Sequence, residues 1–226
     1  MNTTPSWDSI WEKIFSTQEW GKYPPEHVIR FIARRFYKVP DRRQIKLLDI
    51  GAGTGACTWF MAREGFDVSS IEASPSAVQQ ARERFAREGL TGDLREGNFG
   101  QLPWPDHTFD AVVENISLCC NPFAQCQQVV AEVRRVLKPR GHFLSSNLSN
   151  ETSGASTGEK VGRNEYRVLH EGPLHNRGFA LLMDRTQIDE LYAPFTDVSV
   201  EKATWTTGAM TQKIDWWIVE CRTPES

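Results

Sequence analysis

The stretch that decides the fold is Lys46–Phe60, KLLDIGAGTGACTWF. Its apolar run ends in Asp49, and glycines then follow at every second position, Gly51, Gly53 and Gly55. Glycine has no Cβ, so the backbone can turn sharply after a strand, admit a ligand closely and let the next helix pack tightly on the sheet. The stretch therefore predicts a buried strand, a ligand-binding turn and a helix.

The chain beyond this stretch alternates between strand-like and helix-like segments. We expect strands at 45–51, 66–73, 94–98, 109–115 and 142–148, and helices at 56–64, 74–89, 122–141 and 184–195. This repeated alternation predicts an α/β fold with an open, mostly parallel, doubly wound sheet and helices on both faces. Segments 197–205 and 213–222 leave no room for a crossover helix, so we expect an antiparallel hairpin at the sheet edge.

Two further regions flank the alternating core. Residues 6–37 are predicted to be helical, with a break at Pro24 because proline cannot continue a helix. The segment that begins at Ser149 is polar and rich in Gly and Ser, which is typical of a loop or lid. The expected organisation is an N-terminal helical cap at 1–44 and a main domain at 45–226, with a lid or substrate-binding insertion at 149–182.

Composition disfavours several classes of function. The chain has 226 residues, 24% of them charged, and a formal net charge of -3, which indicates a globular protein and argues against a broad nucleic-acid surface. No apolar run reaches the roughly 18 residues of a membrane span, and the N-terminus lacks a signal-peptide core. The five cysteines show no zinc-site spacing and suit a reducing compartment. We therefore expect a cytoplasmic monomer or homodimer with no metal, no nucleic-acid partner and no membrane partner.

Three motifs outside the glycine stretch strengthen its interpretation. Glu72 ends the second strand, where a carboxylate can accept hydrogen bonds from both hydroxyls of a ribose. GNFGQLPWPDHTFDAVV at 97–113 and VLKPRGHF at 136–143 follow it. With LLDIGAGTG, these motifs make residues 45–148 resemble the class I S-adenosylmethionine-dependent methyltransferases, in particular the small-molecule branch of the ubiquinone-biosynthesis type.

This resemblance implies a fold, a cofactor and a set of cofactor contacts. The fold would be Rossmann-like with a seven-stranded sheet and an antiparallel C-terminal strand, and the cofactor would be S-adenosylmethionine. Asp49 would approach its amino group, Glu72 would hold its ribose, and Asn98, where the family usually has aspartate, would flank its adenine. The implied cofactor-binding residues are Asp49, Gly51, Ala52, Gly53, Gly55, Glu72, Ala73, Asn98, Phe99, Glu114 and Asn115.

The methyl acceptor leaves a weaker signal in the sequence. Relatives often carry a histidine pair where Cys119 and Cys120 stand, so the candidate catalytic residues are instead His170 and His175, in an insertion of the kind that covers the acceptor site in this family. His27 lies early in a predicted helix, where we expect it to be exposed. The candidate substrate-binding residues are Trp11, Trp20, Tyr23, Asn147 and Arg177.

Three functions remain open on the sequence. The first is methyl transfer to an oxygen or nitrogen of a small molecule, such as a sugar-like compound, a metabolite or a natural-product intermediate. The second is a nicotinamide-dependent oxidoreductase, although its fingerprint places the third glycine one residue later than Gly55. The third is a non-catalytic S-adenosylmethionine-binding protein, because the sequence identifies no general base.

Overall fold

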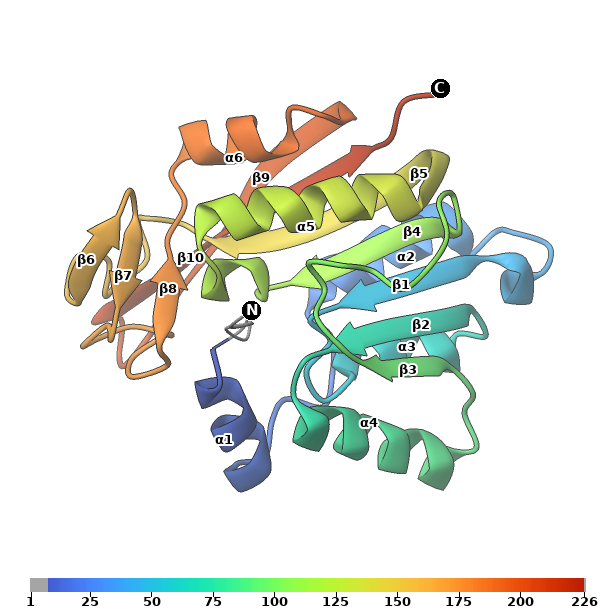
Figure 1. Cartoon of the computed structure of the whole chain (residues 1–226), viewed down its shortest axis with the longest axis horizontal. Coiled ribbons are helices and arrows are strands. Elements are labelled where there is room, and N and C mark those ends of the chain that lie inside the picture. The colour runs from blue at the N-terminus through green and yellow to red at the C-terminus, as the bar shows by residue number, and fades with distance from the viewer. Residues whose placement is uncertain (1–7, 226) are drawn as a thin grey trace, which may run out of the picture.

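A twisted seven-stranded sheet forms the centre of the computed structural model, which describes residues 8–225 (Figure 1). Its strand order is β3-β2-β1-β4-β5-β10-β9. The strands are β1 (Lys46–Ile50), β2 (Asp67–Glu72), β3 (Asp93–Glu96), β4 (Phe109–Asn115), β5 (Leu137–Leu148), β9 (Thr196–Thr207) and β10 (Gln212–Arg222). β1 to β5 run parallel, whereas β10 is antiparallel to both β5 and β9. The predicted mostly parallel sheet and its C-terminal hairpin are therefore confirmed.

Helices cover both faces of the sheet. They are α2 (Glu26–Phe36), α3 (Ala56–Arg63), α4 (Pro75–Glu88), α5 (Phe123–Val136) and α6 (Arg185–Tyr192). One hydrophobic cluster joins α5 and α6 to Val112 and Phe143 of the sheet. A second joins α2, α3 and α4 to Val113 and Leu144. Neighbouring residues of β4 and β5 thus face opposite clusters, which explains why these strands are apolar along their whole length.

Local signals set several helix boundaries. The Ser74 hydroxyl accepts a hydrogen bond from the Ala77 N–H at 3.2 Å, and Gly89 ends α4 in the left-handed conformation, as predicted. α5 ends at Val136, before the Gly141 that we expected to stop it. Because the residue before a proline avoids the helical region, Pro139 favours an extended Lys138, and β5 already begins at Leu137.

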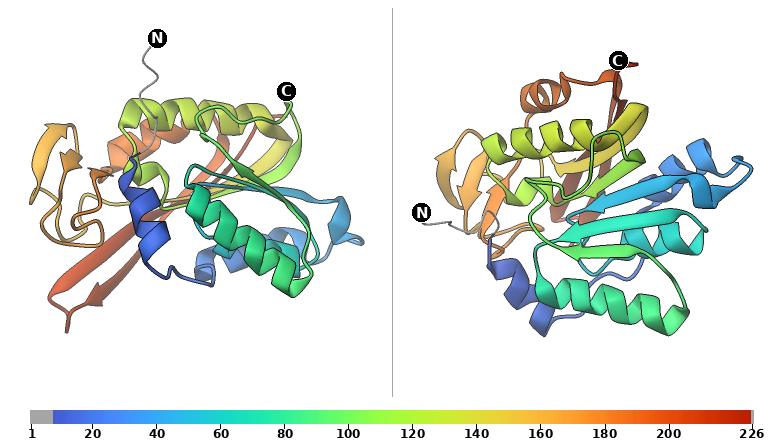
Figure 2. Two further views of the ribbon diagram at one scale, coloured as in Figure 1. Left: turned by 60° about the horizontal axis from the view of Figure 1, so that its bottom comes forward. Right: turned by 45° about the vertical axis from the view of Figure 1, so that its right-hand side comes forward.

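The N-terminal region forms two short helices with the predicted break at Pro24 between them. α1 (Ile10–Thr17) is separated from α2 by the irregular segment 18–25, so the predicted helix is absent over 18–23, and residues 6 and 7 of that prediction lie outside the described residues. Gly21, Pro24 and Pro25 lie in the segment, and each disfavours a helix interior. α1 lies beside α4, at the end of the sheet where β1, β2 and β4 terminate (Figures 1 and 2).

The insertion at 149–182 folds into a small sheet of its own. Its strands are β6 (Glu159–Gly162), β7 (Glu165–Arg167) and β8 (Phe179–Leu181). Leu169, Leu174 and Leu182 of the insertion are buried with Leu148 in a third hydrophobic cluster. The β9–β10 hairpin extends past the body of the main sheet on the same side (Figure 2). The division of the chain at 44/45 stays a prediction.

No helix among residues 8–225 combines the length and the apolar composition that a membrane span requires.

Candidate active site

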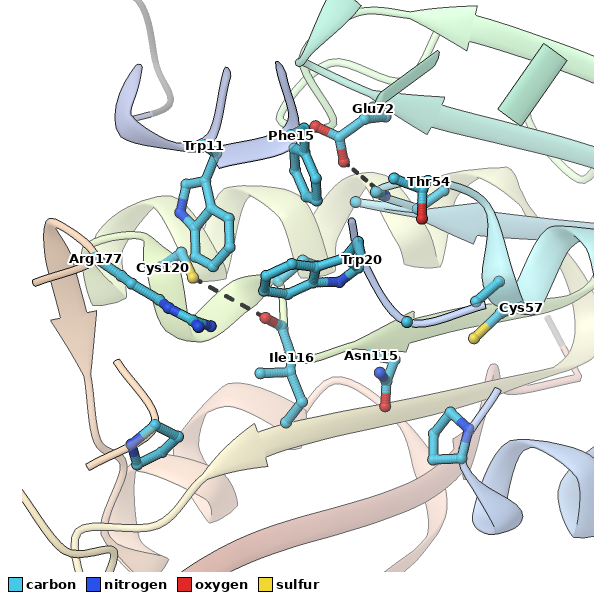
Figure 3. A pocket seen from close by; sticks show the side chains of 18 of the residues that line it. Trp11, Phe15, Trp20, Thr54, Cys57, Glu72, Asn115, Ile116, Cys120 and Arg177 are labelled. Atoms are coloured by element: carbon cyan, nitrogen blue, oxygen red, sulfur yellow. Dashed lines mark hydrogen bonds between the residues drawn. The ribbon is translucent and has the colours of Figure 1, made fainter. Parts of the chain in front are cut away.

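A cavity of about 360 Å³ opens at the carboxyl ends of β1, β2 and β4 (Figure 3). The turn after β1 forms one wall, and α1 with the segment that follows it forms another. The insertion and the β9–β10 hairpin close the remaining sides. Ligands of open α/β sheets bind at this edge, outside the carboxyl ends of the strands.

The glycine turn after β1 has almost no room for side chains. Gly51, Gly53 and Gly55 all have positive φ, at 62°, 53° and 81°. A Cβ on Gly51 would lie 2.3 Å from the Ser117 Cβ, and one on Gly53 would lie 3.3 Å from the Phe15 ring. Gly51, Ala52 and Gly53 line the cavity.

Gly55 does not lie where a cofactor-binding residue was expected. It does not line the cavity, and a Cβ there would lie 3.0 Å from the Ala81 Cβ of α4. Gly55 therefore lets the start of α3 pack closely against α4. It helps to build the turn without facing a ligand.

Asp49 lies under the glycine turn and borders the cavity. Its side chain is buried, and its Oδ2 accepts hydrogen bonds from the Thr58 N–H at 2.9 Å and the Thr58 Oγ1–H at 2.6 Å. Burial raises the pKa of Asp49 to about 7. Near neutral pH this carboxyl group is consequently balanced between its two charge states, and a cation beside it would favour ionisation.

Glu72, at the end of β2, ties the glycine turn to the neighbouring strand. Its Oε2 accepts from the Gly53 N–H at 2.9 Å, and its Oε1 accepts from the Ser74 N–H at 2.9 Å. Burial raises the pKa of this carboxyl group. Each carboxylate oxygen has a second lone pair, so Glu72 can still accept from ligand hydroxyls. Ala73 and the buried Phe99 line the cavity nearby.

Two more of the predicted cofactor residues, Asn98 and Glu114, do not line the cavity. Asn98 is exposed, and its Oδ1 accepts from the Gly100 N–H at 2.8 Å, so it shapes its own turn. Glu114 is fully buried, and its Oε1 accepts from the Ser117 and Leu118 N–H groups at 2.6 and 3.0 Å. Glu114 therefore holds the turn after β4, and it is Ser117 that reaches the cavity.

Asn115, the last residue of β4, lines the cavity and contacts a histidine behind it. The His27 Nε2 lies 3.2 Å from the Asn115 Oδ1 and 2.8 Å from the Ser146 Oγ. Asn115 and Ser146 are paired across β4 and β5, and the start of α2 lies over them. The prediction that His27 is exposed is therefore wrong: it is half-buried, and burial lowers its pKa.

α1 is fastened across the mouth of the cavity by polar contacts with α4. The Ser74 and Ser76 hydroxyls both donate to the Glu12 carboxylate, and the Gln80 Nε2 donates to the Phe15 carbonyl at 2.6 Å. A carboxylate at the N-terminus of a helix is also favoured by the helix dipole. These contacts hold the Phe15 ring over Gly53.

Indole rings dominate the cavity wall farther from the glycine turn. Trp11 and Trp20 come from the N-terminal region, and Trp205 and Trp216 come from the C-terminal hairpin. Tyr23 lies at the rim and is 73% exposed. The Arg177 guanidinium lies 5.1 Å from the centre of a Trp20 ring. Four of the five predicted substrate-binding residues thus line the cavity: Trp11, Trp20, Tyr23 and Arg177.

The fifth, Asn147, lies on the other side of the sheet. It is fully buried, and its Nδ2 donates to the Ser145 Oγ and the Tyr192 OH, both at 3.0 Å. Side chains alternate along a strand, so the Ser146 side chain points toward His27 and the Asn147 side chain points toward α6. Asn147 cannot reach the cavity from there.

His170 and His175 are both exposed, and neither lines the cavity. Leu174, between them, is the residue of this loop that turns inward and is buried. The His175 Nε2 instead lies 2.9 Å from the Nδ2 of its neighbour Asn176. The structure therefore does not bring the two predicted catalytic histidines to the site.

Several lining residues were missed from the sequence. Phe15, Ile116, Ser117, Cys120, Asn121, Trp205, Ile214 and Trp216 all line the cavity. Trp205 is paired with Ile214 across the hairpin, and Trp216 lies two residues farther along, so the three share one face. The alternation of residues along each strand indicates which of them share a face. It does not give the pairing register that places Trp205, Ile214 and Trp216 on the cavity.

Residues 47–141 match the family model of a methyltransferase domain. A demethylmenaquinone methyltransferase of Tropheryma whipplei is 38% identical over 106 residues, which are 46% of this chain and 42% of that protein. A glycine/sarcosine/dimethylglycine N-methyltransferase of Actinopolyspora halophila is 34% identical over 118 residues, 51% of this chain and 20% of that protein. The chain thus spans less than half the length of these curated relatives.

A solved structure of a SAM-dependent methyltransferase from Methanosarcina mazei has the same fold. It superposes with a TM-score of 0.66 at 18% identity and covers 81% of this chain and 94% of that one. Together, the matches confirm the resemblance to class I S-adenosylmethionine-dependent methyltransferases and the Rossmann-like fold. They also support S-adenosylmethionine as the cofactor that this family implies.

Proposed function

We propose that this chain, with a methyltransferase domain at 47–141, transfers the methyl group of S-adenosylmethionine to an oxygen or nitrogen of a small molecule. The observation that carries the proposal is that one cavity is lined by both the glycine turn with its carboxylates and a separate aromatic wall. Such a cavity offers one end for a cofactor and another for an acceptor, which a group transfer requires.

The cofactor end fits S-adenosylmethionine in chemistry as well as in space. The positive φ angles and missing side chains of Gly51 and Gly53 let a ligand approach the backbone. Glu72 has lone pairs for ribose hydroxyls, and a cationic amino group would favour the ionised form of Asp49. The proposed cofactor contacts are Asp49, Gly51, Ala52, Gly53, Glu72, Ala73, Phe99 and Asn115, whereas Gly55, Asn98 and Glu114 support the turns around them.

Positioning and exclusion of water would supply most of the catalysis. The sulfonium of the cofactor provides an already activated methyl group, and the chain must hold a nucleophile in line with it in a dry site. α1 closes one side of the cavity through Glu12, and indole rings cover the acceptor end. A neutral amine needs no general base, and an oxygen acceptor benefits from one only where its pKa is high.

A non-catalytic S-adenosylmethionine-binding protein is the second candidate. One observation favours it: none of the histidines in the described part of the chain lines the cavity. The nicotinamide oxidoreductase is disfavoured by the domain match and by the glycine spacing. A cytoplasmic location remains part of the proposal because the five cysteines are free thiols. The monomeric or homodimeric state is also proposed.

The test is methyl transfer itself. The purified chain is incubated with S-adenosylmethionine and a panel of small phenols, carboxylic acids and amines, and S-adenosylhomocysteine and methylated products are measured by mass spectrometry. The proposal expects a methylated product together with S-adenosylhomocysteine. Saturable cofactor binding with no product from any compound class would favour the non-catalytic alternative.

A further inference from the structure

We propose that the acceptor is a flat, aromatic molecule that carries a carboxylate, and that Arg177 binds this carboxylate. The inference rests on the proposed methyl transfer and adds the chemical class of the acceptor. Two features of the cavity support it: its indole walls, and the Arg177 guanidinium, which has no carboxylate partner among the described residues.

The walls of the acceptor end favour a planar apolar body. The Trp205 and Trp216 rings meet edge to face with centroids 4.7 Å apart, and the Trp11 and Trp20 rings do so at 5.8 Å. All four line the cavity, and they come from two regions far apart in the sequence. Trp205 remains 38% exposed although it is large and apolar. Rigid indole faces bind aromatic rings well, since both surfaces are flat.

The same end of the cavity has hydrogen-bond donors without acceptors. Arg177 is the only Lys or Arg among the described residues that lines the cavity, and its guanidinium lies against the Trp20 ring without a hydrogen-bond or ion-pair partner in that part of the chain. A guanidinium that lines a cavity without an acceptor favours a ligand that supplies oxygen acceptors.

The acidic groups around the cavity already have donors. The Asp8 Oδ1 accepts from the Ile10 N–H at 3.1 Å, and its Oδ2 accepts from the Phe179 N–H at 3.1 Å. Asp49 and Glu72 also accept hydrogen bonds, and they belong to the proposed cofactor end. Each of these carboxylates therefore has a protein donor, whereas the Arg177 guanidinium has no hydrogen-bond or ion-pair partner among the described residues and can pair with an anionic oxygen group of a ligand.

The position of Arg177 separates it from the proposed cofactor contacts. It enters from the insertion, and in Figure 3 it lies on the opposite side of Trp11 and Trp20 from Glu72 and Thr54. A guanidinium there can pair with a carboxylate through two parallel hydrogen bonds. We assign that carboxylate to the acceptor and not to the methionine part of the cofactor.

The test is calorimetric titration of the whole chain saturated with S-adenosylhomocysteine. The probes are a hydroxynaphthoate, its methyl ester, which has the same ring without the charge, and sarcosine, an aliphatic amino acid. We expect the hydroxynaphthoate to bind at least about tenfold more tightly than the ester, as a charge-assisted pair would give. Arg177→Gln should remove this preference, and Arg177→Lys should restore part of it. Arg167→Gln, an exposed control in the same insertion, should keep the preference.

Four results would overturn the inference. Equal binding of acid and ester, or an acid preference that survives Arg177→Gln, would show that Arg177 does not recognise a carboxylate of the acceptor. Weaker S-adenosylhomocysteine binding by Arg177→Gln alone would assign the arginine to the cofactor. Binding of sarcosine in place of the hydroxynaphthoate would exclude the aromatic body. If S-adenosylhomocysteine does not bind at all, the proposed function fails. The same probes titrated into the cofactor-free chain then show separately whether the cavity binds an aromatic carboxylate through Arg177.

Discussion

Asp49 is an ionisable residue that is buried next to the cavity. Its carboxyl group is buried below the glycine turn, accepts hydrogen bonds from Thr58 and borders the cavity. Because burial raises its pKa to about 7, ionisation and ligand binding should be linked. A cationic ligand group beside Asp49 would have to favour loss of its proton.

The affinity for S-adenosylmethionine should therefore rise with pH over the range in which Asp49 of the free protein titrates, around pH 7. Below pH 7 the free carboxyl group is protonated, and binding of the cofactor's ammonium group must release that proton. We expect roughly tenfold tighter binding at pH 7.5 than at pH 5.5, measured by calorimetry in buffers of different ionisation enthalpy. Asp49→Asn should bind more weakly at pH 7.5 and show a flat profile. An equally steep profile in the variant would exclude Asp49 as the linked group.

Gly51 tests whether the shape of the glycine turn is needed for cofactor binding. Gly51→Ala would place a Cβ 2.3 Å from the Ser117 Cβ, whereas Gly65→Ala, also at positive φ, meets nothing within 4 Å. Both variants carry the left-handed penalty of about 1–2 kcal/mol. Gly51→Ala should lose cofactor binding while remaining folded by circular dichroism, and Gly65→Ala should retain it. Unchanged binding by Gly51→Ala would place the cofactor elsewhere.

At the scale of elements, α1 acts as a clamp over the glycine turn. Its Glu12 carboxylate accepts hydrogen bonds from the hydroxyls of Ser74 and Ser76 at the start of α4. Burial of α1 is limited to Ile14 and Phe15. The helix therefore depends on its polar contacts to stay over the cavity.

Glu12→Ala should loosen this clamp without unfolding the chain. Loss of a charge-assisted contact predicts about tenfold weaker S-adenosylmethionine binding, mainly through faster dissociation. Stopped-flow measurement of the dissociation rate would check this. Glu19→Ala, which removes an exposed carboxylate just after α1, is the control and should leave the rate unchanged. An unchanged rate for Glu12→Ala would contradict the role of α1.

The elements themselves could be predicted where local signals suffice. Ser74 and Gly89 bound α4, and the apolar runs at β1 and β4 identify buried strands. The glycine turn follows β1 directly and Glu72 ends β2, so their place at one sheet edge could also be predicted. The roles of His27 and Asn147 could not, because they depend on which helix covers β5 and on which face each residue of β5 presents.

The insertion and the hairpin show the limit of sequence patterns. Trp205 and Trp216 reach the cavity only because the β9–β10 register puts both on one face. His170 and His175 miss it because Leu174 is the buried anchor of their loop. Both outcomes depend on tertiary packing between segments distant in sequence, which no local periodicity records.

For the whole molecule, half-buried histidines should make stability depend on pH. Burial, with help from the Arg35 and Arg222 charges, lowers the pKa of His142 to about 4, and burial lowers that of His27 as well. At these two histidines the unfolded chain, with a pKa near 6.5, binds more protons between those values. Their contribution to the free energy of unfolding should therefore fall as pH drops from about 6.5 to 4, whereas Asp49, whose pKa is raised to about 7, contributes in the opposite direction.

This dependence can be measured by urea denaturation at pH 7 and pH 5. His142→Gln should show a smaller loss of unfolding free energy between the two pH values than the unsubstituted chain. His170→Gln, at an exposed position, should lose as much as the unsubstituted chain. A loss in His142→Gln that matches the unsubstituted chain would show that protonation of His142 is not linked to unfolding.

The most direct test of the central claim is calorimetric titration of the whole chain with S-adenosylmethionine and, separately, with NAD. The cavity described above predicts saturable binding of S-adenosylmethionine at one site per chain and no binding of NAD. Absence of S-adenosylmethionine binding, or saturable binding of NAD in its place, would contradict the account.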